Sequence, residues 1–385
     1  MQYRVGISGS YGGWNLGDEA ILEGIVKELR RTAPAEVVVF SRDPEDTMRR
    51  HAVERAIPAR DLSREELKQE IARLDALIIG GGGILFDDEA EIFLRETAVA
   101  EELGVPVVVY AVSVGPLENR TTRERLIRCL ERAEIVTVRE RYSRRLLERI
   151  GLRRDITVTS DPALLVEPAP LPSDTFAREG LVEGQTVVGL SVREPGVAAP
   201  DLDERHYHQL LADAADYMVY RYDTDIVFVA MERRISDLQQ SHAVVSKMAH
   251  ADRARVLRGE YSAGEMLSLI GRLDFAIGMR LHFLMFAAMQ RVPFVPLAYA
   301  DKIAGFLRHL DMQIPPVQDM RAGQLIARID RCWDWRQQVR ADIDGRLPAL
   351  RERARETNAL LVELLQQRKP RPTLAHAVHP FPPPA

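Results

Sequence analysis

Short apolar segments alternate with amphipathic segments along most of the chain, and this alternation constrains the fold more than any other feature. The first series contains the apolar segments 4–8, 37–40, 76–79, 107–111, 135–138 and 156–159, with helical patterns such as 19–31, 91–103 and 122–132 between them. Apolar strands that alternate with helices indicate a parallel sheet with helices on both faces. The sequence therefore predicts an α/β fold.

A second series of the same kind follows a proline-rich segment at 167–174. Proline stiffens a connection and interrupts regular structure, so this segment separates two domains. With 385 residues, the chain is long enough for two hydrophobic cores, and we predict two Rossmann-like domains that face each other across a cleft. The predicted divisions are a first domain at 1–170, a linker at 171–183, a second domain at 184–334, a C-terminal helix at 335–367 that packs back on the first domain, and a disordered, proline-rich tail at 368–385.

Residues suited to ligand binding gather directly after the predicted strands. They comprise the loop Gly9–Asp18, the run Gly80–Gly83, the segment Ser113–Pro116, Arg139 and the pair Asp161-Pro162. In an open parallel sheet, ligands bind beyond the carboxyl ends of the strands. This distribution predicts a ligand-binding cleft at one edge of the sheet.

The strongest candidate site is the segment Phe275–Phe283, in which an apolar strand breaks at Gly278 and leads into a helix that begins with Arg280, Leu281 and His282. Free N–H groups at a helix start favour bound anions. A guanidinium can bind two oxygens of a phosphate or carboxylate, and an imidazole exchanges a proton near neutral pH. The structural alternative is a buried histidine bonded to a carbonyl and an arginine in an ion pair.

Three more cations lie at matching points of the predicted domains. Arg139 and Arg193 each end a strand, and Lys302 begins a helix. Any one of them alone fits an ordinary surface charge, but together with Arg280 they predict a cationic pocket that binds substrate.

The glycine-rich turn Gly9–Glu19 is the second candidate, because glycine lets the backbone approach a ligand. It lacks the G-x-G-x-x-G pattern of dinucleotide sites, and no Gly-Lys-Ser/Thr follows as in a P-loop. Asn15 in this turn is a predicted substrate contact. Asp18 and Glu19 have two interpretations: they cap the following helix, or one of them takes a proton from a sugar hydroxyl.

Four consecutive glycines follow the apolar segment 76–79. Such a run is entropically costly unless a ligand or another backbone must come close. Gly81 and Gly82 are therefore predicted substrate contacts, and the alternative is tight packing against a helix.

Composition excludes several classes of protein. A net charge of -5 gives no overall attraction to nucleic acid. Cys129 and Cys332 have no metal-ligand spacing, and His206 and His208 lack thiol or carboxylate company, so neither zinc nor a structural disulfide is expected. The longest apolar run, at 105–117, is too short to span a bilayer, and the N-terminal residues show no cleavable signal. We expect a cytoplasmic protein.

A basic run contains arginines at 139, 141, 144, 145, 149, 153 and 154. Base rates favour a solvated helix face for such a run. The alternative is a surface that rests on the inner face of the cytoplasmic membrane, where a lipid-linked substrate would lie.

Taken together, these motifs resemble the polysaccharide pyruvyl transferase family, which includes bacterial enzymes that place pyruvate ketals on cell-wall polymer precursors. The resemblance runs from Gly9 to about Leu307. In chain order it rests on Gly12 with Asn15–Ala20, Gly80–Leu85, Val114–Leu117, Val138–Glu140, Asp161–Ala163, Gly278–His282, and Tyr299 with Lys302. Phe86 and Glu140 depart from the pattern of many relatives, which leaves the acceptor open.

The resemblance implies two domains of the glycosyltransferase-B-like kind and transfer of pyruvate from phosphoenolpyruvate to two hydroxyls of one sugar. The sugar would be N-acetylmannosamine in a lipid-linked precursor, with the first domain on the acceptor side and the second on the phosphoenolpyruvate side. Arg280, Arg139, Arg193 and Lys302 would bind the donor, and His282 would protonate it. Asp18 or Glu19 would be the base or the acceptor's anchor. No metal or cofactor is implied.

A glycosyltransferase that uses a nucleotide sugar is the rival prediction, since the same fold and a cationic cleft also suit a diphosphate. The two predictions differ in the ligand that protects the protein against melting.

Overall fold

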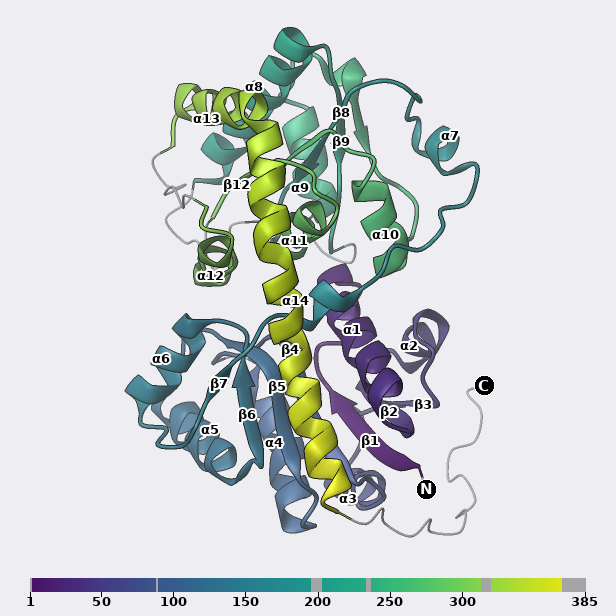
Figure 1. Cartoon of the computed structure of the whole chain (residues 1–385), viewed down its shortest axis with the longest axis vertical. Coiled ribbons are helices and arrows are strands. Elements are labelled where there is room, and N and C mark those ends of the chain that lie inside the picture. The colour runs from purple at the N-terminus through teal and green to yellow at the C-terminus, as the bar shows by residue number, and fades with distance from the viewer. Residues whose placement is uncertain are drawn as a thin grey trace.

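The computed structural model describes residues 2–87, 89–194, 203–232, 237–298, 300–312 and 320–368. The chain forms two lobes stacked along the long axis of the molecule, each built on its own parallel sheet (Figure 1). The predicted fold class, two α/β domains, is thereby confirmed. Of the predicted tail at 368–385, only Arg368 is among the described residues.

The first domain contains a seven-stranded parallel sheet in the order β3-β2-β1-β4-β5-β6-β7. The strands are β1 (Tyr3–Ser8), β2 (Ala35–Ser41), β3 (Arg55–Pro58), β4 (Ala76–Leu85), β5 (Val107–Val114), β6 (Ile135–Val138) and β7 (Thr157–Val158). The helices are α1 (Leu16–Thr32), α2 (Pro44–Arg50), α3 (Arg64–Ile71), α4 (Ala90–Glu102), α5 (Arg120–Arg132) and α6 (Arg141–Ile150), with a short 3-10 turn η1 (Pro162–Leu165).

Strand β5 shows why the strands of this sheet have continuous apolar runs in their sequence. All of its residues are buried. Val108 and Tyr110 belong to the core under α1, whereas Val107 and Val109 belong to the core under α4 and α5. Successive side chains point to opposite faces, so a strand covered on both faces must be apolar throughout.

The second domain contains a five-stranded parallel sheet in the order β10-β9-β8-β11-β12. The strands are β8 (Val187–Ser191), β9 (Asp225–Phe228), β10 (Ala254–Val256), β11 (Phe275–Gly278) and β12 (Phe294–Pro296). The helices are α7 (Thr175–Glu179), α8 (Glu204–Tyr222), α9 (Asp237–Val245), α10 (Ala263–Ile270), α11 (Leu281–Met289), α12 (Asp301–His309) and α13 (Ala322–Asp334), with a 3-10 turn η3 (Ala251–Arg253). Helix α7 lies within the predicted linker at 171–183.

Each sheet reverses its strand order at one point, between β1 and β4 in the first domain and between β8 and β11 in the second. Ligands of open α/β sheets bind beyond the strand ends at such a reversal. The loops that follow these four strands contain the glycine-rich turn, Phe86, Arg193 and Arg280. The two reversals therefore direct the candidate loops of both domains toward the space between the lobes.

The four-glycine run differs from its prediction, because it continues β4 instead of ending it. Gly80, Gly82 and Gly83 pair with β5, and the strand extends to Leu85. A Cβ atom at Gly81 would lie 1.9 Å from Cγ2 of Ile21, and one at Gly82 would lie 2.9 Å from Oδ1 of Asp18. Helix α1 therefore packs directly on these glycines, as the structural alternative for this run expected.

The C-terminal helix α14 (Arg336–Gln366) extends along both lobes (Figure 1). In the first domain, the hydroxyl of Thr357 bonds to those of Thr137 and Thr159, at 3.0 and 3.1 Å. Towards its start, Asp344 pairs with Arg291 of the second domain at 2.6 Å. Pro348 lies inside the helix between these two attachments. Helix α14 is therefore a second connection between the domains, in addition to the linker.

Candidate active site

A cavity of about 240 Å³ lies between the two domains, beyond the carboxyl ends of both sheets. The predicted site residues that line it are Asn15, Asp18, Arg139, Arg193, Arg280, Leu281, His282 and Lys302. The predicted residues that do not line it are Glu19, Gly81 and Gly82. The structure thus brings together side chains that are more than 250 positions apart in the sequence, as from Asn15 to His282.

His282 lies in the first turn of α11, and its side chain is 13% exposed. Its imidazole packs across the domain boundary against Gly17 of α1, and its Nε2 lies 3.4 Å from Oδ2 of Asp161, longer than a good hydrogen bond. Burial lowers the pKa of His282 below its usual value; Asp161 raises this pKa, and the cations Arg139 and Lys302 lower it. The imidazole is therefore mainly neutral at pH 7 in this structure.

The contact with His282 predicts that Gly17→Ala destabilises the protein. A Cβ atom at Gly17 would lie 2.0 Å from Nδ1 of His282, so the ring must move. We expect a loss of about 1–3 kcal/mol in the free energy of unfolding, the usual range for an overpacked site. Urea unfolding measures it, and Gly345→Ala in α14 is the control, because nothing lies within 4 Å of its added Cβ. A Gly17→Ala protein as stable as wild type would contradict this close contact.

Asp161 joins His282 to Arg139. The Nη1 of Arg139 donates to Oδ2 of Asp161 at 2.5 Å, the same oxygen that faces the imidazole. The N–H of Ala163 donates to Oδ1 at 2.9 Å. Burial acts to raise the pKa of Asp161, but Arg139, His282 and this N–H outweigh it and hold the pKa well below its usual range. Asp161 is therefore a fixed carboxylate that binds Arg139 and favours a positive charge on the nearby imidazole.

Arg280 is held by two carboxylates of its own domain. Its Nε donates to both oxygens of Asp237, at 3.2 and 3.0 Å. Its Nη2 donates to Asp237 at 2.5 Å and to Glu232 at 2.7 Å. The edge that was predicted to bind two oxygens of an anion is thus occupied by Asp237, as in the structural alternative. Because two carboxylates offset its charge, Arg280 contributes less positive potential to the cavity than the prediction assumed.

Asp18 lines the cavity from the first turn of α1. It does not cap this helix; the cap is Asn15, whose Oδ1 accepts from the N–H of Gly17 at 3.0 Å. Burial raises the pKa of Asp18 to about 7, and Glu19 raises it too, while nearby cations including Lys302 oppose the rise. Asp18 therefore exchanges a proton near neutral pH, which suits an acid or base.

Glu19 is buried and points away from the cavity lining. Its Oε1 accepts from the N–H of Gly12 at 2.9 Å, and its Oε2 lies 2.7 Å from Nε2 of His51. These contacts attach the glycine-rich turn to the end of α2. Of the two neighbouring acids, only Asp18 is placed to meet a ligand in the cavity, and Glu19 supports the turn.

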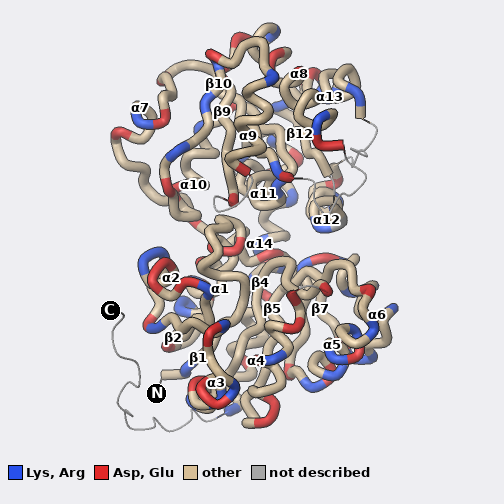
Figure 2. Tube along the Cα trace, turned by 180° about the vertical axis from the view of Figure 1, so that it is seen from behind, with Lys and Arg blue, Asp and Glu red and all other residues tan. Residues whose placement is uncertain are grey.

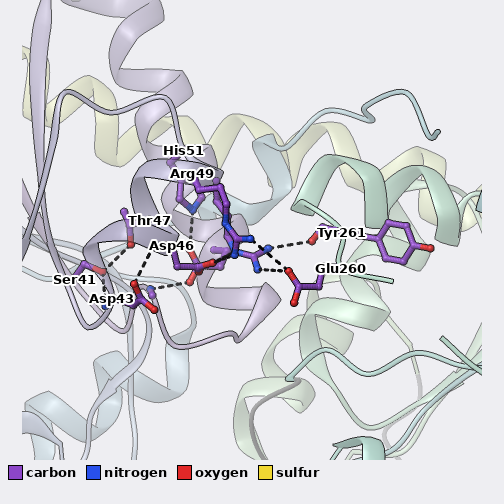
Figure 3. A network of polar contacts seen from close by, with 11 residues as sticks. Ser41, Asp43, Asp46, Thr47, Arg49, His51, Glu260 and Tyr261 are labelled. Carbon is purple, nitrogen blue, oxygen red and sulfur yellow. Dashed lines mark hydrogen bonds and ion pairs between the residues drawn. The ribbon is translucent and has the colours of Figure 1, made fainter. Parts of the chain in front are cut away.

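Helix α2 also reaches the second domain, where Glu260 and Tyr261 face it (Figure 3). The Nη1 of Arg50 donates to the carbonyl of Tyr261 at 3.5 Å, and its Nη2 lies 3.7 Å from Glu260. The guanidinium of Arg50 lies over the ring of Trp14, 5.4 Å from its centroid. The glycine-rich turn is thereby held between the two domains.

Three residues of the first-domain wall, Arg42, Phe86 and Glu89, were not among the predicted site residues, and neither were Met231 and Glu232 of the second domain. Ser10, Gly13 and Gly83 belong to the glycine-rich loop and the glycine run, which were predicted to line the cleft. Arg42 directly follows β2, so the strand-end rule that selected Arg139 would also have found it. Phe86, noted only as a departure from the family pattern, and Glu89 were not placed in the site because β4 was expected to end at Ile79, six residues before its observed end at Leu85.

No group of three or more His, Cys, Asp and Glu side chains is placed to hold a metal ion within the described ranges. His206 contacts the carbonyl of Met320, and His208 contacts Gln240. The same part of the chain contains no helix that is both long and apolar enough for a bilayer. Tyr299, which the family resemblance grouped with Lys302, lies outside the described residues.

Three arginines of the basic run at 139–154 are engaged in contacts within the protein. Arg139 is buried, Arg144 pairs with Glu148 at 2.7 Å, and Arg154 donates to the carbonyl of Glu134 at 3.0 Å. Acidic and basic positions are interspersed along α5 and α6 (Figure 2). These contacts favour the solvated-face interpretation of this run.

Comparisons with known proteins agree with the fold and with the family that the sequence resembles. The family model described as polysaccharide pyruvyl transferase matches residues 15–301. The amylovoran biosynthesis protein AmsJ of Erwinia amylovora is 20% identical over 283 residues, which are 70% of this chain and 68% of that protein.

Among solved structures, the UDP-GlcNAc 2-epimerase of Methanocaldococcus jannaschii has a TM-score of 0.66 at 12% identity, over 94% of this chain and 99% of its own. The UDP-GlcNAc 2-epimerase of Neisseria meningitidis bound to UDP-GlcNAc has a TM-score of 0.65 at 10% identity. The match covers 96% of this chain and 100% of the epimerase chain. At such low identity these structures show the fold alone, which is glycosyltransferase-B-like.

Proposed function

Because the chain belongs to the polysaccharide pyruvyl transferase family and is thus an enzyme of polysaccharide biosynthesis, we propose that it transfers pyruvate from phosphoenolpyruvate to two hydroxyls of one sugar, with release of phosphate. The observation that supports this donor best is the cavity itself. Arg193 and Lys302 line it together with the imidazole of His282 and with Arg139, whose charge Asp161 and Glu140 partly offset. Phosphoenolpyruvate has a phosphate and a carboxylate, and several fixed cations are suited to binding both.

The proposed reaction balances without an oxidant or metal. Carbon 3 of phosphoenolpyruvate takes a proton, which makes carbon 2 electrophilic. One sugar hydroxyl attacks carbon 2 and loses its proton, the bond from carbon 2 to the phosphate oxygen breaks, and the second hydroxyl attacks in turn. Two hydroxyl protons are released, and they account for the proton on carbon 3 and the proton on the phosphate.

His282 is the proposed proton donor to carbon 3. Its pKa is lowered in this structure, but the donor's negative charges would raise it, because a nearby anion favours the imidazolium. Asp161 would stabilise the same charged form from 3.4 Å. Asp18, with a pKa of about 7, is the proposed base that takes a proton from an attacking hydroxyl.

The proposed acceptor is a sugar in a polysaccharide precursor. Similarity to a protein named for amylovoran biosynthesis supports this class. N-acetylmannosamine in a lipid-linked cell-wall precursor, and contact of the enzyme with the membrane that holds it, are the narrower predictions from the sequence.

Thermal melting with phosphoenolpyruvate tests the donor. At a concentration of 100 Kd, the ligand should stabilise the protein by about 2.7 kcal/mol. In Lys302→Ala, donor affinity should fall about 10- to 100-fold, because a hydrogen bond to a charged group contributes about 1.5–3 kcal/mol. Arg308→Ala on the same helix is the control, since Arg308 is exposed and does not line the cavity. Protection by a nucleotide sugar but not by phosphoenolpyruvate would favour the glycosyltransferase alternative.

A further inference from the structure

The first-domain wall of the cavity differs in chemistry from the wall that faces it. It is formed by the loops after β1, β2 and β4, and it includes Gly13, Arg42, Phe86 and Glu89. The opposite wall supplies His282, Arg193 and Lys302, and also Arg280, whose charge is offset by Glu232 and Asp237. The proposed donor is accounted for by that opposite wall and by Arg139, so the first-domain wall is available for a different ligand.

Arg42 and Glu89 form an ion pair on this wall. The Nη2 of Arg42 lies 3.3 Å from each oxygen of Glu89, a loose two-oxygen contact, and both side chains are partly exposed, at 25% and 30%. The Nη1 lies against Gly13, where a Cβ atom would approach it to 3.4 Å. The Nε is buried and has no hydrogen-bond partner within the described part of the chain. The pair has donors and acceptors but no net charge, so it suits hydroxyl groups better than an anion.

Phe86 provides the apolar part of the same wall. It is half-buried, and a Cβ atom at Gly115 would lie 2.9 Å from its own Cβ, so the absence of a side chain at Gly115 is what seats Phe86 here. Among the described lining residues, Phe86 is the only one with a phenyl, phenol or indole ring. A pyranose presents C–H groups on one face and hydroxyls around its rim, which an apolar ring beside a neutral ion pair complements.

Asp18 lies on the boundary between the two walls. It belongs to the first domain, yet the pKa of its carboxyl is affected by Lys302 of the second. Gly82 brings it close to β4, because a side chain at that position would approach Oδ1 to 2.9 Å. A ligand on the first-domain wall would therefore have a proton acceptor on the side that faces the donor.

We propose that this wall is the acceptor subsite, and that it binds an electrically neutral pyranose with two neighbouring hydroxyls. The apolar face of the sugar lies on Phe86. Hydroxyls remote from the reaction contact Arg42 and Glu89, and a reacting hydroxyl faces Asp18. This assignment rests on the proposed function, and it adds the class of acceptor and the residues that select it.

Binding of simple glycosides tests the subsite without requiring turnover. The probes are nitrophenyl glycosides of N-acetylmannosamine, galactose and glucose, with binding measured by ligand-detected NMR. Phe86→Ala should weaken binding of the best probe about tenfold or more, and Phe86→Tyr should restore most of it, since the ring is retained. Glu89→Gln should weaken the same probe. Tyr220→Ala, at an 83% exposed position on α8, is the control and should bind as wild type does.

Donor binding, measured by melting with phosphoenolpyruvate, should be unchanged in Phe86→Ala and Glu89→Gln. Glycoside affinity equal to wild type in both variants would overturn the subsite, as would a wild-type protein that binds phosphoenolpyruvate but none of the probes. If glycosides bind and depend on Phe86 while phosphoenolpyruvate does not bind, the subsite stands and the proposed donor is wrong.

Discussion

The His282→Gln variant is expected to bind phosphoenolpyruvate and yet release phosphate about 100- to 10,000-fold more slowly than wild type, the usual contribution of a positioned general acid. Glutamine keeps a polar group near Asp161 but cannot supply a proton. The measurement is phosphate release with a glycoside acceptor, combined with donor binding by melting. Turnover equal to wild type would remove the proposed role of His282.

The matched control for this variant is His309→Gln. His309 is also a partly buried imidazole in the second domain, where burial, Arg353 and Arg141 lower its pKa to about 4. It does not line the cavity of the candidate site, so turnover should stay near wild type. A pH profile adds a second readout: the wild-type rate should decline as His282 loses its proton, and the His282→Gln profile should lack that decline.

Asp18→Asn is expected to melt at a higher temperature than wild type at pH 8 and to lose turnover by about 100-fold or more. The folded protein holds the Asp18 proton with a pKa of about 7, whereas an unfolded aspartate titrates near 3.9. The folded state therefore binds more protons, and wild type loses stability as the pH rises from about 4 to about 7. Asparagine cannot ionise. The stability of Asp18→Asn relative to wild type should therefore increase from about pH 4 to about pH 7 and stay constant at higher pH.

Glu96→Gln is the matched control for the pH effect. Burial raises the pKa of Glu96 to about 7, although a hydrogen bond from Ser8 and nearby arginines oppose the rise. Glu96 lies on α4 and does not line the cavity. This variant should show a similar gain in melting temperature at high pH, with turnover near wild type. An Asp18→Asn protein that melts below wild type at pH 8 would contradict the burial of the charge.

The fold could be predicted from the sequence because its pattern is local. The apolar strands and capped helices recur in both domains, as in the capping boxes at Ser63 and Ser262, where the structure has both reciprocal hydrogen bonds. Three elements without a strong apolar pattern were missed: α2, β3 and α7. Helix α13 was also missed, although its apolar residues recur at helical spacing and include the buried Leu325 and Ile329. The start of α2 has a clear signal that was overlooked, since Asp43 caps it and Pro44 occupies its first turn.

The site was predictable where a residue type and a strand end coincide, as for Asp18, Arg139 and His282. Other features depend on tertiary partners that the sequence does not specify. Arg280 is held by Asp237, which lies 43 positions earlier in the chain. Likewise, the sequence does not show that His51 lies beside Glu19. This contact identifies Glu19 as a buried support of the turn, whereas its neighbour Asp18 lines the cavity. Pairings at such sequence separations arise from packing, which a pattern of residue types does not encode.

The chain crosses between the lobes twice, once in the proline-rich connection after η1 and once in α14. Both crossings are attached to the two lobes, so a movement of one lobe relative to the other must strain or bend them. Within α14, proline at 348 removes one backbone hydrogen bond between the attachment at Asp344 and that at Thr357, which weakens the helix at this turn. We therefore expect α14 to bend at Pro348 if the lobes move relative to each other.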